Sequence, residues 1–372
     1  MERFPVIVVG SGPAGLATAQ QLSKRGISHV VLERGDTCAH VWRNLYDSLT
    51  LHTGRHLSAL PDCPFPKGTP LFPSRADFVA YLDQYAERFE LPVRTGVEVT
   101  SATYVDDEWR LETSAGPFVC GVLVCAAGIV STPVTPEIPG REGFGGSVSH
   151  AWSYRRPEPL RGRRVLVVGV GNTGGEIAPE IATVAERVDV AVRSGALAVP
   201  KKMFGVPIQY QGWLLAFFPR WVMRFFARCT ARLGALVRGP SPLPPPATTS
   251  DNCPDVPLIG FSLVDALKSG AVGLRPGLDA FTSTGVRFSD GTEAPYDEVI
   301  FATGYRATMG FLESGGVGRD DCGFGRRTDR VTSADRPSLF FVGHNYDSRG
   351  GLCNLAIDAK RVGKRVAALL LS

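Results

Sequence analysis

Residues 5–35 and 162–200 share one pattern of apolar and polar positions. Each begins with a short apolar run, continues through a glycine-rich turn and a stretch with helical spacing of apolar residues, and ends with a second apolar run. Uninterrupted apolar runs of this length are typical of parallel strands that are buried on both faces. The pattern therefore predicts two strand–turn–helix–strand units, and no other part of the sequence repeats it.

Further helices and strands are predicted outside these two units. Ser74 to Phe89 is expected to form a helix, because Ser74 is a suitable N-cap and apolar residues follow at helical spacing. Strand signals occur near 93–105, 108–113, 119–127 and 339–342, and a last helix is predicted from about 352 to 371. Alternating strands and helices indicate the α/β class, here with two Rossmann-like dinucleotide-binding domains.

Both glycine-rich turns have the spacing Gly-x-Gly-x-x-Gly. The residues of the first are Gly10, Gly12, Pro13, Ala14 and Gly15, and those of the second are Gly169, Gly171, Asn172, Thr173 and Gly174. The first glycine permits the tight turn, the second lets the backbone approach a pyrophosphate, and the third lets the helix pack close to the strand. The helix N-terminus then offers free N–H groups to the phosphates. We expect all of these residues to line two dinucleotide sites.

The two turns differ in the charged residue that ends the following strand. Glu33, followed by Arg34, has this place in the first unit, whereas Arg193 has it in the second. A carboxylate there accepts hydrogen bonds from ribose hydroxyls, and an arginine pairs with a 2′-phosphate. The sequence therefore predicts FAD in the first site and NADPH in the second. Pro179 falls inside the second helix and predicts a kink.

The composition is that of an ordinary globular protein with a mild preference for anionic ligands. The 372 residues carry a formal net charge of +4, 44% are hydrophobic and 20% are charged. This charge is too small to indicate nucleic acid, and no dense basic block with interleaved aromatic residues occurs. The first strand starts close to Met1, and no apolar run reaches the roughly 18 residues of a membrane span. We therefore expect a cytoplasmic protein.

The histidines and cysteines form no metal or redox motif. His52 and His56 have helical spacing, but Gly54 argues against a helix, and we expect no metal. The eight cysteines are scattered without a C-x-x-C pair, so we expect thiols in a reducing compartment. A disulfide reductase, which needs a cysteine pair beside its flavin, is disfavoured. An NAD(P)H oxidase, a flavin-dependent reductase of the pyridine-nucleotide oxidoreductase type, a monooxygenase and a non-enzymatic NADPH binder stay open.

Residues 212–238 combine arginines at every fourth position with aromatic residues. An amphipathic helix of this kind more often packs its apolar side on the protein body, and it can also make a weak contact with a membrane surface. The proline-rich run 239–257 is expected to form a linker or a surface loop.

Two motifs resemble those of the class B flavin-containing monooxygenases. Residues 144–154, which include His150, match the family fingerprint F-x-G-x-x-x-H-x-x-x-(Y/F), and Tyr154 stands where Baeyer–Villiger enzymes carry Trp. The residues Ala302, Thr303, Gly304 and Tyr305 resemble the family motif A-T-G-(Y/F). The segments 42–52, 264–305, 349–352 and 357–361 are most similar to the YUCCA-type branch, which includes plant indole-3-pyruvate monooxygenases.

The resemblance implies that NADPH reduces FAD and that a flavin C4a-hydroperoxide, formed with O₂, oxygenates a small molecule. The reaction would be N- or S-oxygenation, or decarboxylative oxygenation of an indole-3-pyruvate-like 2-oxo acid. His52 aligns with an asparagine that lies over the flavin in animal-type members, so His52 and Thr53 are the candidate catalytic residues. His150 is expected to have a structural or cofactor-positioning role. Further cofactor contacts are expected at Trp42, Gly128, Gly343, Gly351 and Leu352.

The resemblance also implies the domain organisation. Residues 1–155 and 288–372 would form the FAD domain, with an NADPH domain inserted at 156–287. Residues 205–255 match the family poorly, and we expect this basic and aromatic insert to shape the substrate entrance. The substrate and the oligomeric state stay open.

Overall fold

The computed structural model describes residues 1–203, 205–215, 219, 221–222, 225, 229, 239–246, 257–347 and 349–371. The chain divides into two compact units, Met1–Thr132 with Arg306–Ser372, and Pro133–Tyr305. The expected domain joins, at 155/156 and 287/288, both fall inside the second unit. Position 155/156 lies between β8 (Ser147–His150) and β9 (Arg164–Val168), two strands of one sheet of that unit. Position 287/288 lies inside β17 (Gly285–Phe288), a strand of another sheet of the same unit.

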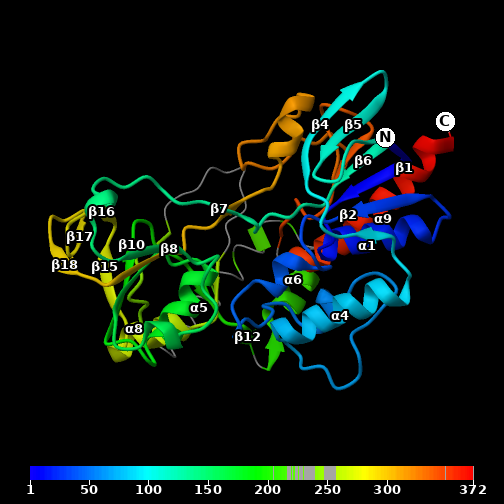
Figure 1. Cartoon of the computed structure of the whole chain (residues 1–372). Coiled ribbons are helices and arrows are strands. Elements are labelled where there is room, and N and C mark those ends of the chain that lie inside the picture. The colour runs from blue at the N-terminus through cyan, green and yellow to red at the C-terminus, as the bar shows by residue number, and fades with distance from the viewer. Residues whose placement is uncertain are drawn as a thin grey trace. The chain divides into compact units, whose positions relative to one another are not determined.

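The first unit is built on a mixed seven-stranded sheet (Figure 1). Its parallel strands are β3 (Val93–Arg94), β2 (His29–Leu32), β1 (Glu2–Val9), β6 (Phe118–Cys125) and β21 (Leu339–Phe341). The antiparallel hairpin of β4 (Val99–Val105) and β5 (Glu108–Thr113) extends the sheet beside β6. The run Val6–Val9 is buried throughout, because β1 is covered on both faces.

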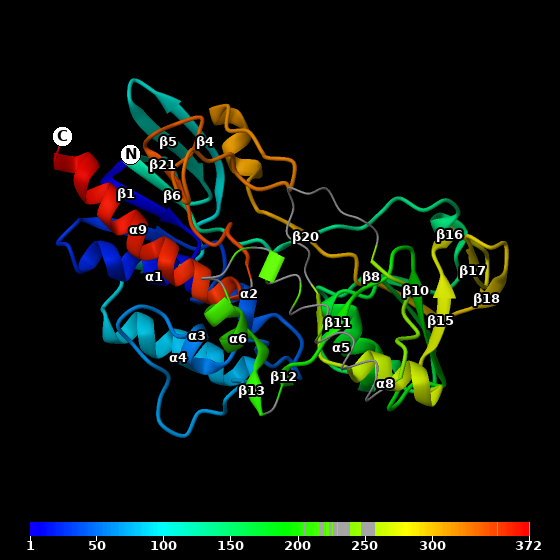
Figure 2. The ribbon, with the colours of Figure 1, turned by 180° about the vertical axis from the view of Figure 1, so that it is seen from behind.

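Helices cover one face of this sheet. They include α1 (Pro13–Ser23), α4 (Arg75–Arg88) and α9 (Gly351–Leu371), with the short helices α2 (His40–Arg43) and α3 (Arg55–Ser58). The 3-10 helix η3 (Gly310–Gly315) belongs to the same unit but not to this layer. Figure 2 shows α9 lying along α1. The expected Ser74 N-cap is confirmed, since its hydroxyl accepts the backbone N–H of Asp77 at the start of α4.

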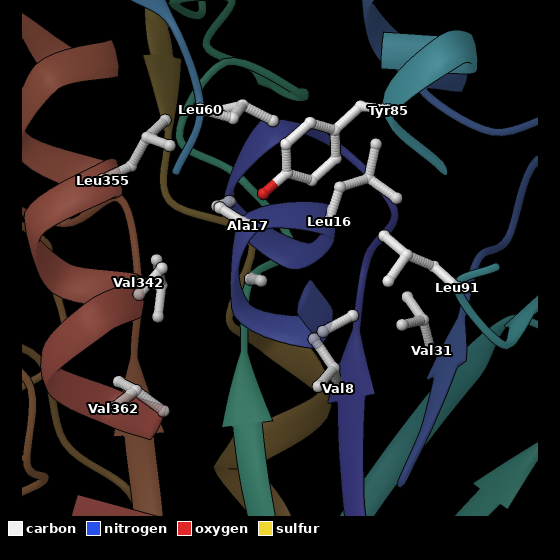
Figure 3. Packing of buried hydrophobic residues seen from close by; sticks show 14 of the residues in the cluster. Val8, Leu16, Ala17, Val31, Leu60, Tyr85, Leu91, Val342, Leu355 and Val362 are labelled. Atoms are coloured by element: carbon white, nitrogen blue, oxygen red, sulfur yellow. The ribbon is translucent and has the colours of Figure 1, made fainter. Parts of the chain in front are cut away.

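The core under these helices joins distant parts of the chain (Figure 3). Side chains from β1, α1, β2, α4 and α9 interdigitate there, among them Val8, Leu16, Val31, Tyr85 and Val362. The alternate residues of β1, Ile7 and Val9, face a second core with Trp109 and Phe341. Because the pleat sends successive side chains to opposite faces, one strand contributes to both cores.

The second unit contains a parallel five-stranded sheet with the order β15-β10-β9-β19-β8. The strands are β8 (Ser147–His150), β9 (Arg164–Val168), β10 (Arg187–Val192), β15 (Gly273–Pro276) and β19 (Glu298–Phe301). Its described helices are α5 (Asn172–Ile181), α6 (Ile208–Leu215) and α8 (Ser262–Ser269), with the 3-10 helices η1 (Arg141–Gly143) and η2 (Glu158–Leu160). Helices α5 and α8 pack together.

The unit also contains smaller sheets of two or three strands. Strand β11 (Ala198–Val199) pairs with β14 (Leu258–Ile259), β12 (Lys202–Met203) pairs with β13 (Val206–Pro207), and β16 (Leu278–Phe281), β17 (Gly285–Phe288) and β18 (Glu293–Pro295) form an antiparallel sheet. Strand β7 (Thr132–Pro133) pairs with β20 (Tyr305–Arg306). Pro179 lies inside α5, but that helix ends at Ile181, so the proline occupies its last turn.

Three further expectations can be compared with the structure. Of the stretch 212–238, only residues 212–215, 219, 221–222, 225 and 229 are described; Trp221 and Phe225 are 72% and 59% exposed, and the rest lies outside the described residues. Among the described helices, none has both the length and the apolar character needed to cross a membrane.

The expectation of eight thiols was wrong for Cys322, which is disulfide-bonded. Spacing along the chain does not reveal such a bond, because folding brings its cysteines together.

Candidate functional site

The first glycine turn joins β1 to α1, and its shape is dictated by steric contact. Gly10 has a φ of +102°, which favours glycine. A Cβ at Gly15 would lie 1.8 Å from the carbonyl oxygen of Gly10, so no side chain fits there. A Cβ at Gly12 would meet no atom of the described residues within 4 Å. The turn is therefore closed toward the protein and open at Gly12, where a pyrophosphate would approach.

The second glycine turn, between β9 and α5, repeats this geometry. Gly169 has a φ of +108°, and a Cβ at Gly174 would lie 2.1 Å from the carbonyl oxygen of Gly169. Gly12 and Gly171 both have φ −69° and ψ −177°, and Gly171 is equally open among the described residues. No described side chain caps either helix at its N-cap. The N–H groups of both helix ends therefore suit an anionic group.

Glu33 follows β2 and is only 6% exposed. Its Oε2 accepts hydrogen bonds from the backbone N–H and the hydroxyl of Ser11, both at 2.8 Å, and its Oε1 accepts the N–H of Gly35 at 2.9 Å. An ionised carboxylate offers about four lone-pair sites, so acceptor capacity remains for ribose hydroxyls. The structure thus holds Glu33 rigidly against the turn that it serves. The neighbouring Arg34 is exposed.

Arg193 has the equivalent place after β10 but a different environment. Its side chain is exposed, and its base packs along Gly277, where a Cβ would lie 3.5 Å from the Cα of Arg193. Among the described residues, no hydrogen-bond or ion-pair partner engages its guanidinium. A guanidinium of this kind is available for bidentate pairing with a phosphate.

Asn172 begins α5 and is committed to the protein. Its Nδ2 donates to the carbonyl of Pro257 at 3.2 Å, and its Oδ1 accepts the N–H of Ile259 at 2.8 Å. The side chain of Leu258 fills the space beside Gly175, where a Cβ would lie 2.4 Å from Leu258 Cδ1. Asn172 therefore fixes strand β14 at the start of the helix. Thr173, next in the turn, is half-buried.

The fingerprint histidine and the Ala-Thr-Gly-Tyr motif lie together in the second unit. His150 ends β8 and pairs in register with Phe301 of β19, immediately before Ala302. Its ring lies 5.1 Å from the ring of Tyr305, edge to face, and its Nδ1 accepts the N–H of Trp152 at 3.0 Å. Burial lowers the pKa of His150, against a hydrogen bond to Gly304. This arrangement supports a structural role for His150.

The same motif closes the second glycine turn. A Cβ at Gly169 would lie 2.7 Å from the carbonyl oxygen of Ala302, and the hydroxyl of Thr303 donates to the carbonyl of Val134. Gly304 has a φ of +86°, and its carbonyl accepts the N–H of Val134 at 3.0 Å. The motif thus shapes the backbone around the turn, which explains its residue types.

The expected flavin-side residues lie together in the first unit. His52 is half-buried, whereas Thr53 is 8% exposed, and its hydroxyl is 2.6 Å from that of Ser58. A Cβ at Gly350 would lie 2.4 Å from Thr53 Cγ2, so the loop before Gly351 and Leu352 packs on the Thr53 methyl. The other residues expected near the cofactor lie as follows. Trp42 contacts Phe78 edge to face, and Gly128 has a φ of +86°. A Cβ at Gly343 would lie 3.6 Å from Ala14 Cβ.

Sequence reasoning missed a buried polar network beside this loop. Asp358 and Asn354 of α9 are fully buried, and they bond to Arg330 and to Asn345. Asp358 lies in the segment 357–361, which resembles the YUCCA-type branch, but that resemblance does not indicate a buried network. One signal was available: Asp358 falls on the apolar face of the predicted last helix, and a buried charge is expected to be paired.

Comparison with known proteins agrees with this geometry. Residues 7–208 match the family model described as pyridine nucleotide-disulphide oxidoreductase. The probable indole-3-pyruvate monooxygenase YUCCA1 of Arabidopsis thaliana is 33% identical, and the match covers 97% of this chain and 89% of that protein. Indole-3-pyruvate monooxygenase YUCCA1 of Oryza sativa subsp. japonica is 32% identical, with 97% and 90% covered. The chain belongs to the flavin-containing monooxygenases.

A solved structure shares the fold over the whole length. The flavin-containing monooxygenase of Stenotrophomonas maltophilia superposes with a TM-score of 0.74 at 24% identity, with 100% of both chains covered. The family prediction and its YUCCA-type branch are thus confirmed. The protein is an oxidoreductase that uses FAD and NADPH. The open backbone at Gly12 and Gly171, with no described side chain capping either helix, fits two dinucleotides.

Proposed function

We propose that the first unit binds FAD and the second binds NADPH, and that the enzyme carries out decarboxylative oxygenation of an indole-3-pyruvate-like 2-oxo acid. The two units would then be an FAD domain with an NADPH domain inserted in it. Similarity to named indole-3-pyruvate monooxygenases over 97% of the chain is the observation that carries the substrate class. N- or S-oxygenation of another small molecule is the alternative outcome of the test.

The chain's own residues have separable tasks in this proposal. When bound, FAD supplies the redox chemistry that delivers one oxygen atom of O₂ to the substrate, with electrons from NADPH. Gly12 and Gly171 let the backbone reach the two pyrophosphates, and Glu33 holds the ribose of FAD. Arg193 pairs with the 2′-phosphate of NADPH, which distinguishes it from NADH.

His52 is the proposed polar group on the flavin side, with Thr53 behind it. Thr53 directs its hydroxyl to Ser58 and its methyl group to Gly350, so its contribution is to hold the segment. His52 is half-buried. Its task would be to keep the oxygen-transfer step coupled to NADPH consumption by orienting substrate and excluding water.

The reaction balances without any further reagent. One oxygen atom enters the 2-oxo acid, the bond between the two carbonyl carbons breaks, and the products are the shortened carboxylic acid and CO₂. The second oxygen atom leaves as water, with the two electrons of NADPH and two protons. Free hydrogen peroxide also converts 2-oxo acids to these products, so an oxidase that merely releases peroxide would imitate the enzyme.

The decisive assay follows NADPH, O₂ and acid product in the presence of catalase. We expect indole-3-pyruvate to stimulate NADPH oxidation, and ¹⁸O from ¹⁸O₂ to appear in the acid although catalase removes peroxide. Loss of the product on adding catalase would show an NAD(P)H oxidase instead. Stimulation by an amine or a thioether alone would overturn the substrate class. In the same assay His52→Ala should uncouple NADPH oxidation from product, and unchanged coupling would remove His52 from the proposal.

A further inference from the structure

One loop of the first unit, here called the loop 343–351 and described at residues 343–347 and 349–351, runs between two parts of the proposed FAD site. At its start Gly343 packs on the first turn of α1, with its would-be Cβ 3.6 Å from Ala14 Cβ. At its end Gly350 packs on Thr53, where a Cβ would come within 2.4 Å of the methyl carbon. The loop therefore connects the glycine turn with the segment that carries His52.

The start of the loop is fixed by Asp358 of α9. This carboxylate is fully buried; its Oδ1 accepts the Nε–H of Arg330, and its Oδ2 accepts Nδ2–H of Asn345 at 2.9 Å. It also accepts a hydrogen bond from the backbone of Gly343. Asn345 donates a second bond to the carbonyl of Arg330 at 2.9 Å and accepts one from Arg327 at 2.8 Å. One buried acid thus holds both Gly343 and Asn345.

The end of the loop is fixed by Asn354, one helical turn before Asp358. Its Nδ2 donates to the carbonyl of Gly350 at 3.0 Å and to Asp347 at 2.9 Å, and Asp347 is ion-paired with Arg349. Its Oδ1 accepts from Arg330 at 2.5 Å. Residues four apart lie on one face of a helix, so a single arginine spans both anchors.

We propose that Arg330, Asn354 and Asp358 are positioning residues that fix the loop 343–351 between the FAD-binding turn and the His52 segment, and so set FAD affinity and the shielding of the flavin side. The proposal rests on FAD binding in the first unit. A buried ion pair is weak evidence for added stability, because apolar residues of similar size often serve as well. What apolar residues cannot replace is the set of hydrogen bonds from this pair and from Asn354 to the loop.

The test separates positioning from stability by comparing two variants. Arg330→Met/Asp358→Leu removes the buried charges together. Asn354→Leu removes the bonds to Gly350, Asp347 and Arg330, while the ion pair of Arg330 with Asp358 stays. We expect both to stay folded without FAD at the assay temperature, although the loop groups that lose partners lower the unfolding temperature. Both should bind FAD about tenfold more weakly, which is about 1.4 kcal/mol. Hydrogen exchange of residues 343–351 should accelerate in both.

Arg365→Ala is the matched control, because Arg365 lies on the same helix and pairs with Asp329 but is 58% exposed. It should change neither FAD affinity nor exchange in the loop. If the double variant and Asn354→Leu keep wild-type FAD affinity and loop exchange, the network is only structural. These readouts need no substrate, so failure of the 2-oxo acid assay with normal FAD binding would reject the proposed function and leave the network proposal standing.

Discussion

The two glycine turns have the same backbone and opposite surroundings. Their open glycines share φ and ψ, and the third glycine of each touches the carbonyl of the first. In the first turn the residue between the first and second glycines is Ser11, which donates two hydrogen bonds to the buried Glu33. In the second it is Val170, which is 5% exposed and has no polar group in its side chain, and Arg193 is exposed.

The shared backbone serves the pyrophosphate that all dinucleotides carry, whereas Glu33 and Arg193 serve the groups that distinguish one dinucleotide from another. The backbone that receives a pyrophosphate is set by steric contact alone, and it is the same for both cofactors. Glu33 is held in place before any ligand arrives, so it loses little freedom on binding, whereas an exposed Arg193 must be ordered. A preorganised site suits a cofactor that stays bound, and a site ordered on binding suits one that exchanges in each turnover.

The largest effects are expected from the closed glycines. In Gly15→Ala and Gly174→Ala the new methyl group meets a backbone oxygen at 1.8 Å and 2.1 Å, so each turn must open. Gly15→Ala should yield protein without FAD. Gly174→Ala should remain yellow but lose reduction by NADPH, as measured by absorbance under anaerobic conditions.

The open glycines are the matched controls for this comparison. Gly12→Ala and Gly171→Ala place a methyl group where no described atom lies within 4 Å, at a φ of −69° that alanine adopts freely. Both should unfold at the wild-type temperature, and any loss of FAD or NADPH then reports contact with the ligand itself. Loss of FAD from Gly174→Ala with intact NADPH binding would reverse the assignment of the two units.

A smaller effect is expected at the charged residue of the second turn. Arg193→Ala should raise the KM for NADPH and leave that for NADH nearly unchanged, because only NADPH carries a 2′-phosphate. Loss of one charged contact to a phosphate is worth roughly 1.5–3 kcal/mol, or around a hundredfold at the upper end. Arg161→Ala, which removes an exposed charge from the same unit, should leave both constants unchanged. Equal use of NADH and NADPH by the wild type would contradict this role.

The parts predicted from sequence are those with local causes. Glycine spacing, apolar runs and the Ser74 cap act within a few residues, and they led to the two turns, their strands and α4. The family motifs led to the family. Arg330 and Asp358, by contrast, are brought together only by folding. The bounds of the second unit depend on the pairing of β8 with β19, which are far apart in the sequence.

The same limit explains the mixed result at Asn172 and Thr53. Both stand where the motifs place them, but their side chains are engaged by Ile259 and Ser58, which no local pattern connects to them. Sequence therefore gave the position of each residue in the turn or loop, and the partner that decides its task came only from the fold.

The smallest expected effect concerns one histidine in each unit. His344, after β21, is 3% exposed, and burial lowers its pKa from 6.5 to about 3, with the charges of Arg327 and Arg319 acting in the same direction. It stays neutral in the folded protein while the unfolded chain takes up a proton near pH 6.5. Stability contributed by this residue is therefore lost progressively as the pH falls from about 6.5 toward 3.

His344→Phe should weaken the dependence of the protein's stability on pH. The substitution gives up the bond from the N–H of Gly325 to Nδ1 at 3.3 Å, so the variant should be no more stable than the wild type at pH 8. Between pH 8 and pH 5 its melting temperature should fall less than that of the wild type. His150→Phe in the second unit should change this slope less, because His150 is only half-buried. Equal slopes for wild type and His344→Phe would mean that another group controls acid stability in the first unit.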